Sequence, residues 1–418
     1  MIERERSGRS GGGRTMVVPP APTWQRSEAA ILRERVGPVG VALWQAARDV
    51  RLWAATESPA RQGLFRAARG TVRRAAILEV PALEPPLERF GTLVRNPHLA
   101  QPQEVAAAAA EIALWAEEGQ LLSTALEFAE AAALADVRSS SAASLAGRLA
   151  RRAGENNKAA AWYRRAIALA RGDHDSYIRA QLGYGGIMFQ VGNYPAATVA
   201  FRRASRLAVK FGRRGPAAQA NHDLLTIACD TGSYEEGAAA AVRALERYPV
   251  RHPRVPHLAH DFGCLLVRNH FFAAALPLLQ RVLELVKPER VVVFGMIARS
   301  AGAVGDRELF ERAHGEVRRG VAQSDEFAAQ ALVHLAAGAQ SLGNWELAAG
   351  VAADAGDIAR KRGNGRPDRE SRMVLAQVAA RSRGDRDLAR AAPVAIQLTV
   401  KPFLRRLEKF APTGSELS

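Results

Sequence analysis

The sequence predicts an all-α protein built from repeated helical hairpins. Ala-rich amphipathic stretches recur through the last three quarters of the 418 residues, each followed by a short turn and a second stretch. Small residues stand at fixed distances from these turns. The turns return about every 38 residues, at Gly119, Gly154, Gly192, Gly232, His270, Gly305, Gly343 and Gly384. This period is typical of a solenoid, in which each unit buries its apolar faces against its two neighbours.

The composition excludes a disordered chain and favours anionic partners. Hydrophobic residues make up 48% of the sequence and charged residues 24%, which is enough to form a core. The 58 Lys and Arg against 42 Asp and Glu give a net charge of +16. All but six of the basic residues are Arg, which is also typical of a GC-rich genome, so codon bias accounts for part of this charge.

Cysteine usage and hydropathy indicate a cytoplasmic protein without a membrane span. Cys229 and Cys264 are too few for a disulfide framework, so we expect a reducing compartment. The longest apolar stretch, around 291–298, is far shorter than a membrane-spanning helix.

We expect four regions along the chain. Residues 1–27 read as a basic Gly/Ser/Arg tail, and 28–100 as a helical region, either degenerate capping repeats or a small separate module. About eight hairpins follow over 101–400, and 401–418 form a C-terminal tail. Two units depart from the pattern, because Phe310 replaces a small residue and Pro393 falls inside the expected last helix. That last unit is a candidate terminal cap.

The segments 154–170, 191–208 and 231–249 resemble the second half of tetratricopeptide repeats. An aromatic residue stands two positions after the turn at Tyr194, Tyr234, Phe272 and Trp345. Small residues stand five positions after the turn and seven before it, where helices must approach closely. The resemblance implies a right-handed superhelix whose first helices line a concave groove.

The resemblance also implies which residues face that groove. The same spacing places Cys229, Asp230, Cys264, Arg268, Met296 and Gln340 on this face. Polar groups on rigid helices suit an extended peptide, and guanidinium groups suit carboxylates, although an internal pair with Glu155 is an equal alternative for the arginines. The carboxylate-clamp subfamily uses Lys and Asn, which are missing here. The expected ligand groove comprises Arg148, Arg152, Arg179, Gln190, Gln219, His222, Asp223, His257, His260, Asp261, Arg299 and His334.

One helix face carries His257, His260, Asp261 and Cys264 at positions i, i+3, i+4 and i+7. A His-Asp pair, His222 and Asp223, lies at equivalent places in the preceding unit. A transition-metal site is an alternative for this group, but the spacing matches no established motif. We therefore expect no metal, no cofactor, no catalytic residues and no enzymatic activity.

The charge is unevenly distributed. Residues 101–137 carry seven acidic side chains and no basic one, so the first hairpin is an acidic patch that could dock a dipolar partner or a second copy. The second helices carry a basic ridge that could contact nucleic-acid phosphates, although few aromatic residues accompany it. The ridge consists of Arg164, Arg165, Arg202, Arg203, Arg206, Lys210, Arg243 and Arg247.

The sequence thus favours a non-enzymatic scaffold or adaptor that binds a protein or peptide with an acidic or carboxylate-bearing segment. One alternative is a regulator similar to the peptide-sensing tetratricopeptide proteins of bacterial signalling. The other is a nucleic-acid-binding protein that uses the basic ridge. The oligomeric state and the partner stay open.

Overall fold

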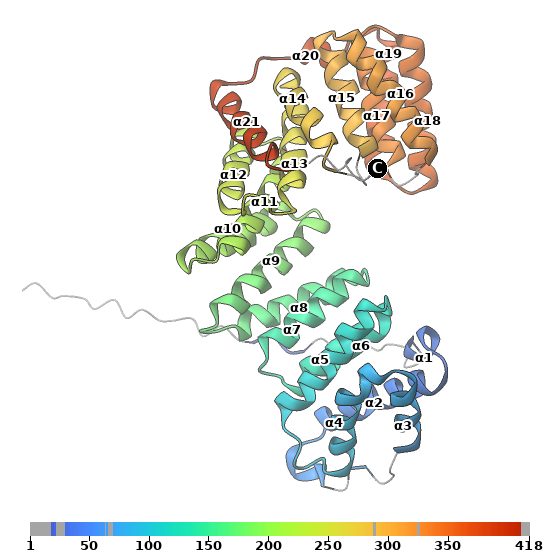
Figure 1. The fold of residues 1–418 in the computed structure, drawn as a ribbon, viewed down its shortest axis with the longest axis vertical. Helices are drawn as coiled ribbons and strands as arrows, with labels where there is room; N and C mark the ends of the chain where they lie inside the picture. Colours follow the sequence, from blue (N-terminus) through green and yellow to red (C-terminus); the bar gives the residue numbers. More distant parts are fainter. Residues whose placement is uncertain are drawn as a thin grey trace, which may run out of the picture. The chain divides into compact units, whose positions relative to one another are not determined.

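The computed structural model describes residues 18–21, 30–62, 64–65, 70–286, 290–323 and 327–410. Every regular element in these ranges is a helix, which confirms the all-α expectation for them (Figure 1). None of the described helices is both long enough and apolar enough to cross a membrane. The chain divides into an N-terminal unit, Met1–Leu207, and a C-terminal unit, Ala208–Ser418.

The N-terminal unit consists of ten helices and two short 3-10 turns among its described residues. The first part holds α1 (Ala30–Glu34), α2 (Gly37–Ala55), η1 (Ser58–Arg61), α3 (Gly70–Glu79), η2 (Pro81–Leu83) and α4 (Glu84–Arg95). Three hairpins follow, formed by α5 (Pro102–Glu118) and α6 (Leu122–Ala135), α7 (Ser140–Arg152) and α8 (Asn156–Leu169), and α9 (His174–Gln190) and α10 (Tyr194–Lys210).

The helices before residue 100 pack on the first hairpin. Helices α1 and α2 lie against α6, and α4 lies against α5, within one hydrophobic cluster. The Glu34 carboxylate accepts hydrogen bonds from the backbone N–H groups of Ser123 and Thr124, at 2.7 and 2.8 Å. It therefore supplies the N-terminal cap of α6 and offsets the positive end of the helix dipole.

The C-terminal unit continues the pattern of paired helices. Its pairs are α11 (Arg214–Thr231) with α12 (Tyr234–Arg247), α13 (Val255–Arg268) with α14 (Phe272–Leu283), α15 (Arg290–Val304) with α16 (Arg307–Gln323), and α17 (Ala328–Ser341) with α18 (Trp345–Lys361). The first helices contact one another in succession, from α11 to α13, α15, α17 and α19 (Gly365–Ala379). These helices form the layer that carries the predicted groove residues.

Left-handed residues end the first helices, as expected, but two of the eight positions shift. Gly154, Gly192, Gly232, Gly305 and Gly343 have φ between +75° and +87°, and His270 has φ +60°. In the first hairpin the left-handed residue is Gln120 and not Gly119. After α19 it is Arg381, three residues before Gly384, which also has a positive φ of +52°. The hydrogen bonds show the same register, because the N–H groups of Arg381 and Ser382 bind the carbonyls of Val378 and Gln377.

The hairpin of α15 and α16 is regular, contrary to the expected degeneracy. Helices α15 and α17 approach so closely that a Cβ on Gly302 would lie 2.2 Å from the Gly338 carbonyl oxygen. A Cβ on Gly338 would in turn lie 3.0 Å from the Phe310 ring. The missing side chain at Gly338 therefore leaves room for the buried Phe310, which compensates for the loss of a small residue there.

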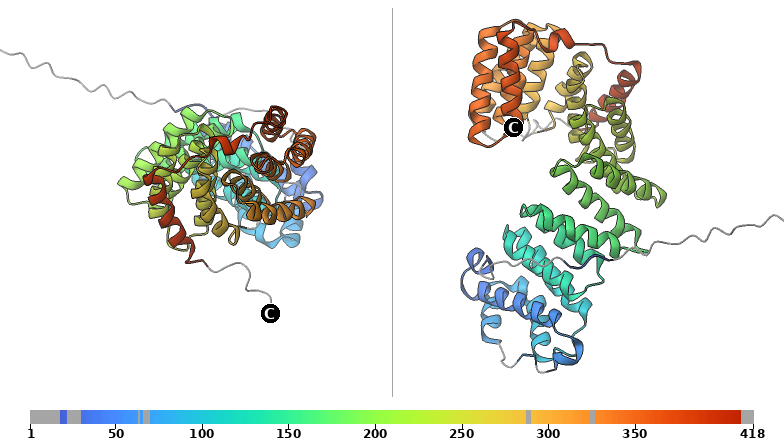
Figure 2. Two further views of the ribbon diagram at one scale, coloured as in Figure 1. Left: turned by 90° about the horizontal axis from the view of Figure 1, so that it is seen from above. Right: turned by 180° about the vertical axis from the view of Figure 1, so that it is seen from behind.

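The end of the chain does not form the expected eighth hairpin. After α19 only α20 (Asp385–Leu388) follows, and α21 (Val394–Leu407) packs against α12, α13 and α14. Figure 2 shows the dark red α21 beside these helices. Pro393 precedes α21 as its N-cap, so it does not interrupt a helix. The predicted tail from 401 is helical to Leu407; 411–418, and all of 1–27 except 18–21, lie outside the described residues.

The buried face of α21 closes the C-terminal unit on itself. The Phe403 ring stacks on Phe262 of α13 at 5.0 Å between centroids, and both rings are fully buried. Arg406 donates a hydrogen bond from Nη1 to the Tyr248 carbonyl oxygen at 3.1 Å. The expectation that each unit contacts only its neighbours is therefore wrong at this end of the chain.

Candidate functional site

In the N-terminal unit, the predicted anion-binding arginines hold an internal carboxylate. The guanidinium groups of Arg148 and Arg152 both pair with Glu117 of α5. Burial alone would raise the pKa of Glu117, but the two arginines outweigh it and lower that pKa below its ordinary value. The alternative partner Glu155 instead pairs with Lys158, at 2.8 Å. The arginines thus have an intramolecular anion, and it comes from the preceding hairpin.

Intramolecular ion pairs also neutralise much of the acidic patch at 101–137. Glu111 pairs with Arg89, Glu127 with Arg51, and Glu130 with both Arg51 and Lys158. These partners lie before and after the acidic hairpin within one unit. The acidic and basic segments of the sequence therefore neutralise each other within one chain. The change in the sign of the charge does not by itself indicate an external partner.

Other predicted groove residues of the N-terminal unit do not gather into a site. Arg179 donates from Nη2 to the Ser176 hydroxyl of its own helix at 3.1 Å, and Gln190 is exposed. One member of the predicted basic ridge is also misplaced. Arg165 is buried, because its guanidinium donates to the carbonyl oxygens of Pro19 and Val137. It is therefore not part of an exposed basic surface.

The C-terminal unit contains a pocket of about 530 Å³ beside its first helices. Five residues that the repeat spacing placed on this face line it: Cys229, Asp230, Arg268, Arg299 and Gln340. The later helices add Glu370, Gln377 and Asp385, and Val333, Val374 and Leu388 supply apolar lining. The pocket thus combines charged groups, amides and a small apolar surface.

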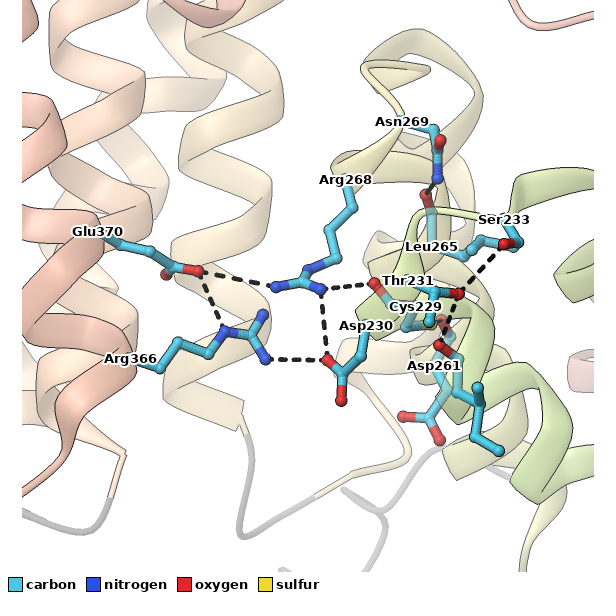
Figure 3. Close-up of polar contacts among 11 residues, drawn as sticks. Cys229, Asp230, Thr231, Ser233, Asp261, Leu265, Arg268, Asn269, Arg366 and Glu370 are labelled. Carbon is cyan, nitrogen blue, oxygen red and sulfur yellow. Dashed lines mark hydrogen bonds and ion pairs between the residues drawn. The ribbon is translucent and has the colours of Figure 1, made fainter. Parts of the chain in front are cut away.

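A network of four charged side chains occupies one side of the pocket (Figure 3). Arg268 contacts Asp230 at 3.3 Å and Glu370 at 3.7 Å, and it also donates to the Cys229 carbonyl oxygen. Arg366 contacts the same two carboxylates, at 3.2 Å and 3.1 Å. The network therefore joins α11 and α13 to α19 within the C-terminal unit.

A second pair is bidentate and more deeply buried. Asp385 of α20 accepts from Arg299 of α15, with its Oδ2 2.6 Å from Nε and its Oδ1 3.1 Å from Nη2. Burial alone would raise the pKa of Asp385, but Arg299 and His270 outweigh it and hold that pKa well below its usual range. Arg299 also lies 3.4 Å from His334 Nδ1. Burial, helped by the Arg299 charge, lowers the pKa of His334 to about 4.

The two predicted His-Asp groups come together at Asp261. Its Oδ2 lies 2.9 Å from His222 Nε2, and its Oδ1 lies 3.1 Å from His260 Nδ1. Burial alone would raise the pKa of Asp261, but the hydrogen bonds from both imidazoles outweigh it and hold that pKa well below its usual range. Cys264 lies near His260, whereas His257 is exposed and apart from this cluster. Gln219 and Asp223 are half-buried on α11.

Sequence reasoning missed Arg366, Glu370 and Asp385. All three belong to the last unit, which looked degenerate because Pro393 falls inside its expected second helix. The Arg366 and Glu370 pair has i, i+4 spacing at the start of α19, which is a recognisable pattern. Nothing in the sequence indicated that α20 would place a carboxylate against Arg299.

Comparisons with known proteins add little to this geometry. No family model and no curated protein matches the chain. Among solved structures, BtubC from P. vanneervenii is 17% identical with a TM-score of 0.41, covering 53% of this chain and 91% of that one. The Pseudomonas aeruginosa pilF structure is 15% identical with a TM-score of 0.43, covering 53% and 99%. A circular tandem repeat protein is 16% identical with a TM-score of 0.17, covering 91% and 98%. At these TM-scores the likeness specifies neither a family nor a function.

Proposed function

We propose that this chain is a cytoplasmic, non-enzymatic scaffold of the tetratricopeptide type, a right-handed solenoid that binds an extended protein segment. The binding surface is the first-helix layer of the C-terminal unit, centred on the pocket beside α11, α13 and α19. The segment carries carboxylate groups, from acidic side chains or from a chain end. This assignment replaces Arg148 and Arg152 as the main anion contacts, since Glu117 already pairs with both.

The observation that carries the proposal is the set of three guanidinium groups around one pocket. Arg268 and Arg299 line it directly, and Arg366 contacts its Glu370. A guanidinium has five N–H donors, so arginines that contact one carboxylate, as Arg299 does, or two, as Arg268 and Arg366 do, retain N–H groups for a further acceptor. The amides of Gln340 and Gln377 suit a peptide main chain. A pocket of about 530 Å³ is within the usual range for bound ligands.

The internal carboxylates have a definite part in this proposal. Asp230 and Glu370 are 23% and 30% exposed, so water and a ligand can reach them. They hold Arg268 and Arg366 in position before binding, so these side chains lose less conformational entropy when a ligand binds. They also repel a ligand carboxylate, so the pocket selects segments whose acidic groups reach the arginines from the open side.

The test is a displayed peptide library selected on the wild-type protein, followed by affinity measurements on two double variants. Arg268→Gln with Arg366→Gln should weaken the selected peptides at least about tenfold, because one decade corresponds to about 1.4 kcal/mol. The control, Arg312→Gln with Arg319→Gln, removes the same charge from exposed positions of α16. If both variants lose affinity equally, the protein binds by bulk charge and the proposed site is wrong.

A further inference from the structure

Three soft or borderline donor atoms meet between α13 and α15, apart from the proposed peptide site. The Cys264 sulfur lies 3.9 Å from His260 Nε2, one helical turn earlier, and 3.5 Å from the Met296 sulfur of α15. Met296 is buried and Cys264 is half-buried. The group is therefore shielded from bulk water but can be reached by a small ion.

The His260 ring lies between the two sulfur atoms and the Asp261 carboxylate. Its Nδ1 faces Asp261, whose second oxygen is held by His222. The tautomer with the proton on Nδ1 presents the Nε2 lone pair to the sulfur atoms. A carboxylate that orients a ligating histidine in this way is a regular feature of metal sites.

The donor separations fit coordination of a single ion. With metal–thiolate bonds of about 2.3 Å and metal–imidazole bonds of about 2.0 Å, neighbouring donors around one ion lie roughly 3.5 to 4 Å apart. Both measured separations, 3.5 Å and 3.9 Å, fall in this range.

We propose that His260 Nε2, Cys264 Sγ and Met296 Sδ bind a monovalent copper ion, with Asp261 as the positioning residue. Thiolate and thioether ligands select Cu(I), whereas Zn²⁺ is bound by thiolate, imidazole and carboxylate donors. One thiolate and one Cu⁺ are neutral together, so the loaded site avoids the large cost of burying a net charge.

The test is titration of the reduced, full-length protein with Cu(I) under anaerobic conditions, in competition with bicinchoninate. We expect one equivalent to be taken from the competitor. Cys264→Ser and Met296→Leu should each weaken binding at least about tenfold, and Asp261→Asn about 10- to 100-fold. Far-UV circular dichroism of each variant checks that it retains its helices.

The matched controls are Cys229→Ser and Met373→Leu, which remove the other thiol and an exposed methionine of the same unit. Both should keep wild-type affinity for Cu(I). If Cys264→Ser does not fold, X-ray absorption of the copper-loaded wild type decides, because we expect sulfur neighbours at about 2.3 Å. The proposal is overturned by failure to compete with bicinchoninate, by nitrogen and oxygen neighbours only, or by Zn²⁺ binding equally tightly without dependence on Met296.

Discussion

Two clusters of ion pairs can be compared: Glu117 with Arg148 and Arg152 in the N-terminal unit, and Asp385 with Arg299 in the C-terminal unit. In each, a carboxylate neutralises one or two arginines on a first helix. Glu117 comes from the preceding hairpin and meets arginines that are more than a third exposed. Asp385 lies 86 residues beyond Arg299, and both side chains are at most one fifth exposed. Adjacent repeats supply the first pairing, whereas the second depends on how the chain returns after its last hairpin.

The two units therefore differ in how their stability is distributed. The pairs around Glu117 follow the nearest-neighbour arrangement of a repeat array. In the C-terminal unit, α20 and α21 connect helices that are distant in sequence, so we expect changes in these short segments to destabilise the unit as a whole.

The largest expected effect is that of Phe403→Ala in α21. This change removes a fully buried ring that stacks on Phe262, and we expect a loss of about 4 kcal/mol in the free energy of unfolding. Hydrogen exchange followed by mass spectrometry should show faster exchange in α12 to α14 and no change in α5 to α8. Leu398→Ala, at an exposed position of the same helix, is the control. Equal destabilisation by both variants would contradict the packing of α21.

A carboxylate-to-amide change in each unit tests the comparison directly. Asp385→Asn leaves the buried Arg299 without its anion, and we expect a cost of about 3 kcal/mol. Glu117→Gln affects half-exposed arginines, and we expect a cost of less than about 1 kcal/mol. Urea unfolding monitored separately for each unit by hydrogen exchange measures both values. Similar costs in the two units would show that burial does not distinguish the clusters.

The third expected effect is a pH dependence of the C-terminal unit between pH 6.5 and 4. The pKa of His334 is about 4 in the folded protein against about 6.5 unfolded, so the unfolded chain binds the additional proton. Stability should therefore fall as pH decreases from 6.5 toward 4, by about 2 kcal/mol at pH 5. The groups that face His334 electrostatically are Arg299, Glu370, Asp385 and His260.

The control is His334→Gln, which should abolish this part of the pH dependence and leave contributions from the other groups. Glu117 gives the comparison in the N-terminal unit, because its lowered pKa makes stability decline only below about pH 4.5. A wild-type and a His334→Gln profile that run parallel between pH 4 and 6.5 would refute the role of His334.

The periodic part of the fold could be predicted from the sequence, and the non-periodic part could not. Glycine at the turns and small residues at helix contacts gave six correct left-handed positions, including His270. The two errors arose where Gln120 and Arg381 adopt that conformation without glycine, so composition did not mark them. The repeat pattern places Pro393 inside the last expected helix, whereas Pro393 is the N-cap residue before α21.

The residues of the candidate site could likewise be predicted where they follow the repeat pattern and not elsewhere. The repeat spacing places Arg268, Arg299 and Gln340 at equivalent positions, and all three line one pocket, because residues at equal phase on stacked helices share a face. It also placed Arg148 and Arg152 together but could not identify Glu117 as their partner, since that depends on side-chain reach between hairpins. Asp385 was unpredictable because its position depends on the irregular segment after α19.

The return of α21 to α13 has a consequence for synthesis on the ribosome. Phe262 emerges 141 residues before Phe403, its stacking partner. Translation proceeds at about 5 to 20 residues per second, so the apolar side of α12 to α14 stays exposed for on the order of ten seconds or more before α21 can pack on it. During that interval the nascent chain presents a surface suited to a chaperone, whereas the hairpins of the N-terminal unit have all their partners already translated.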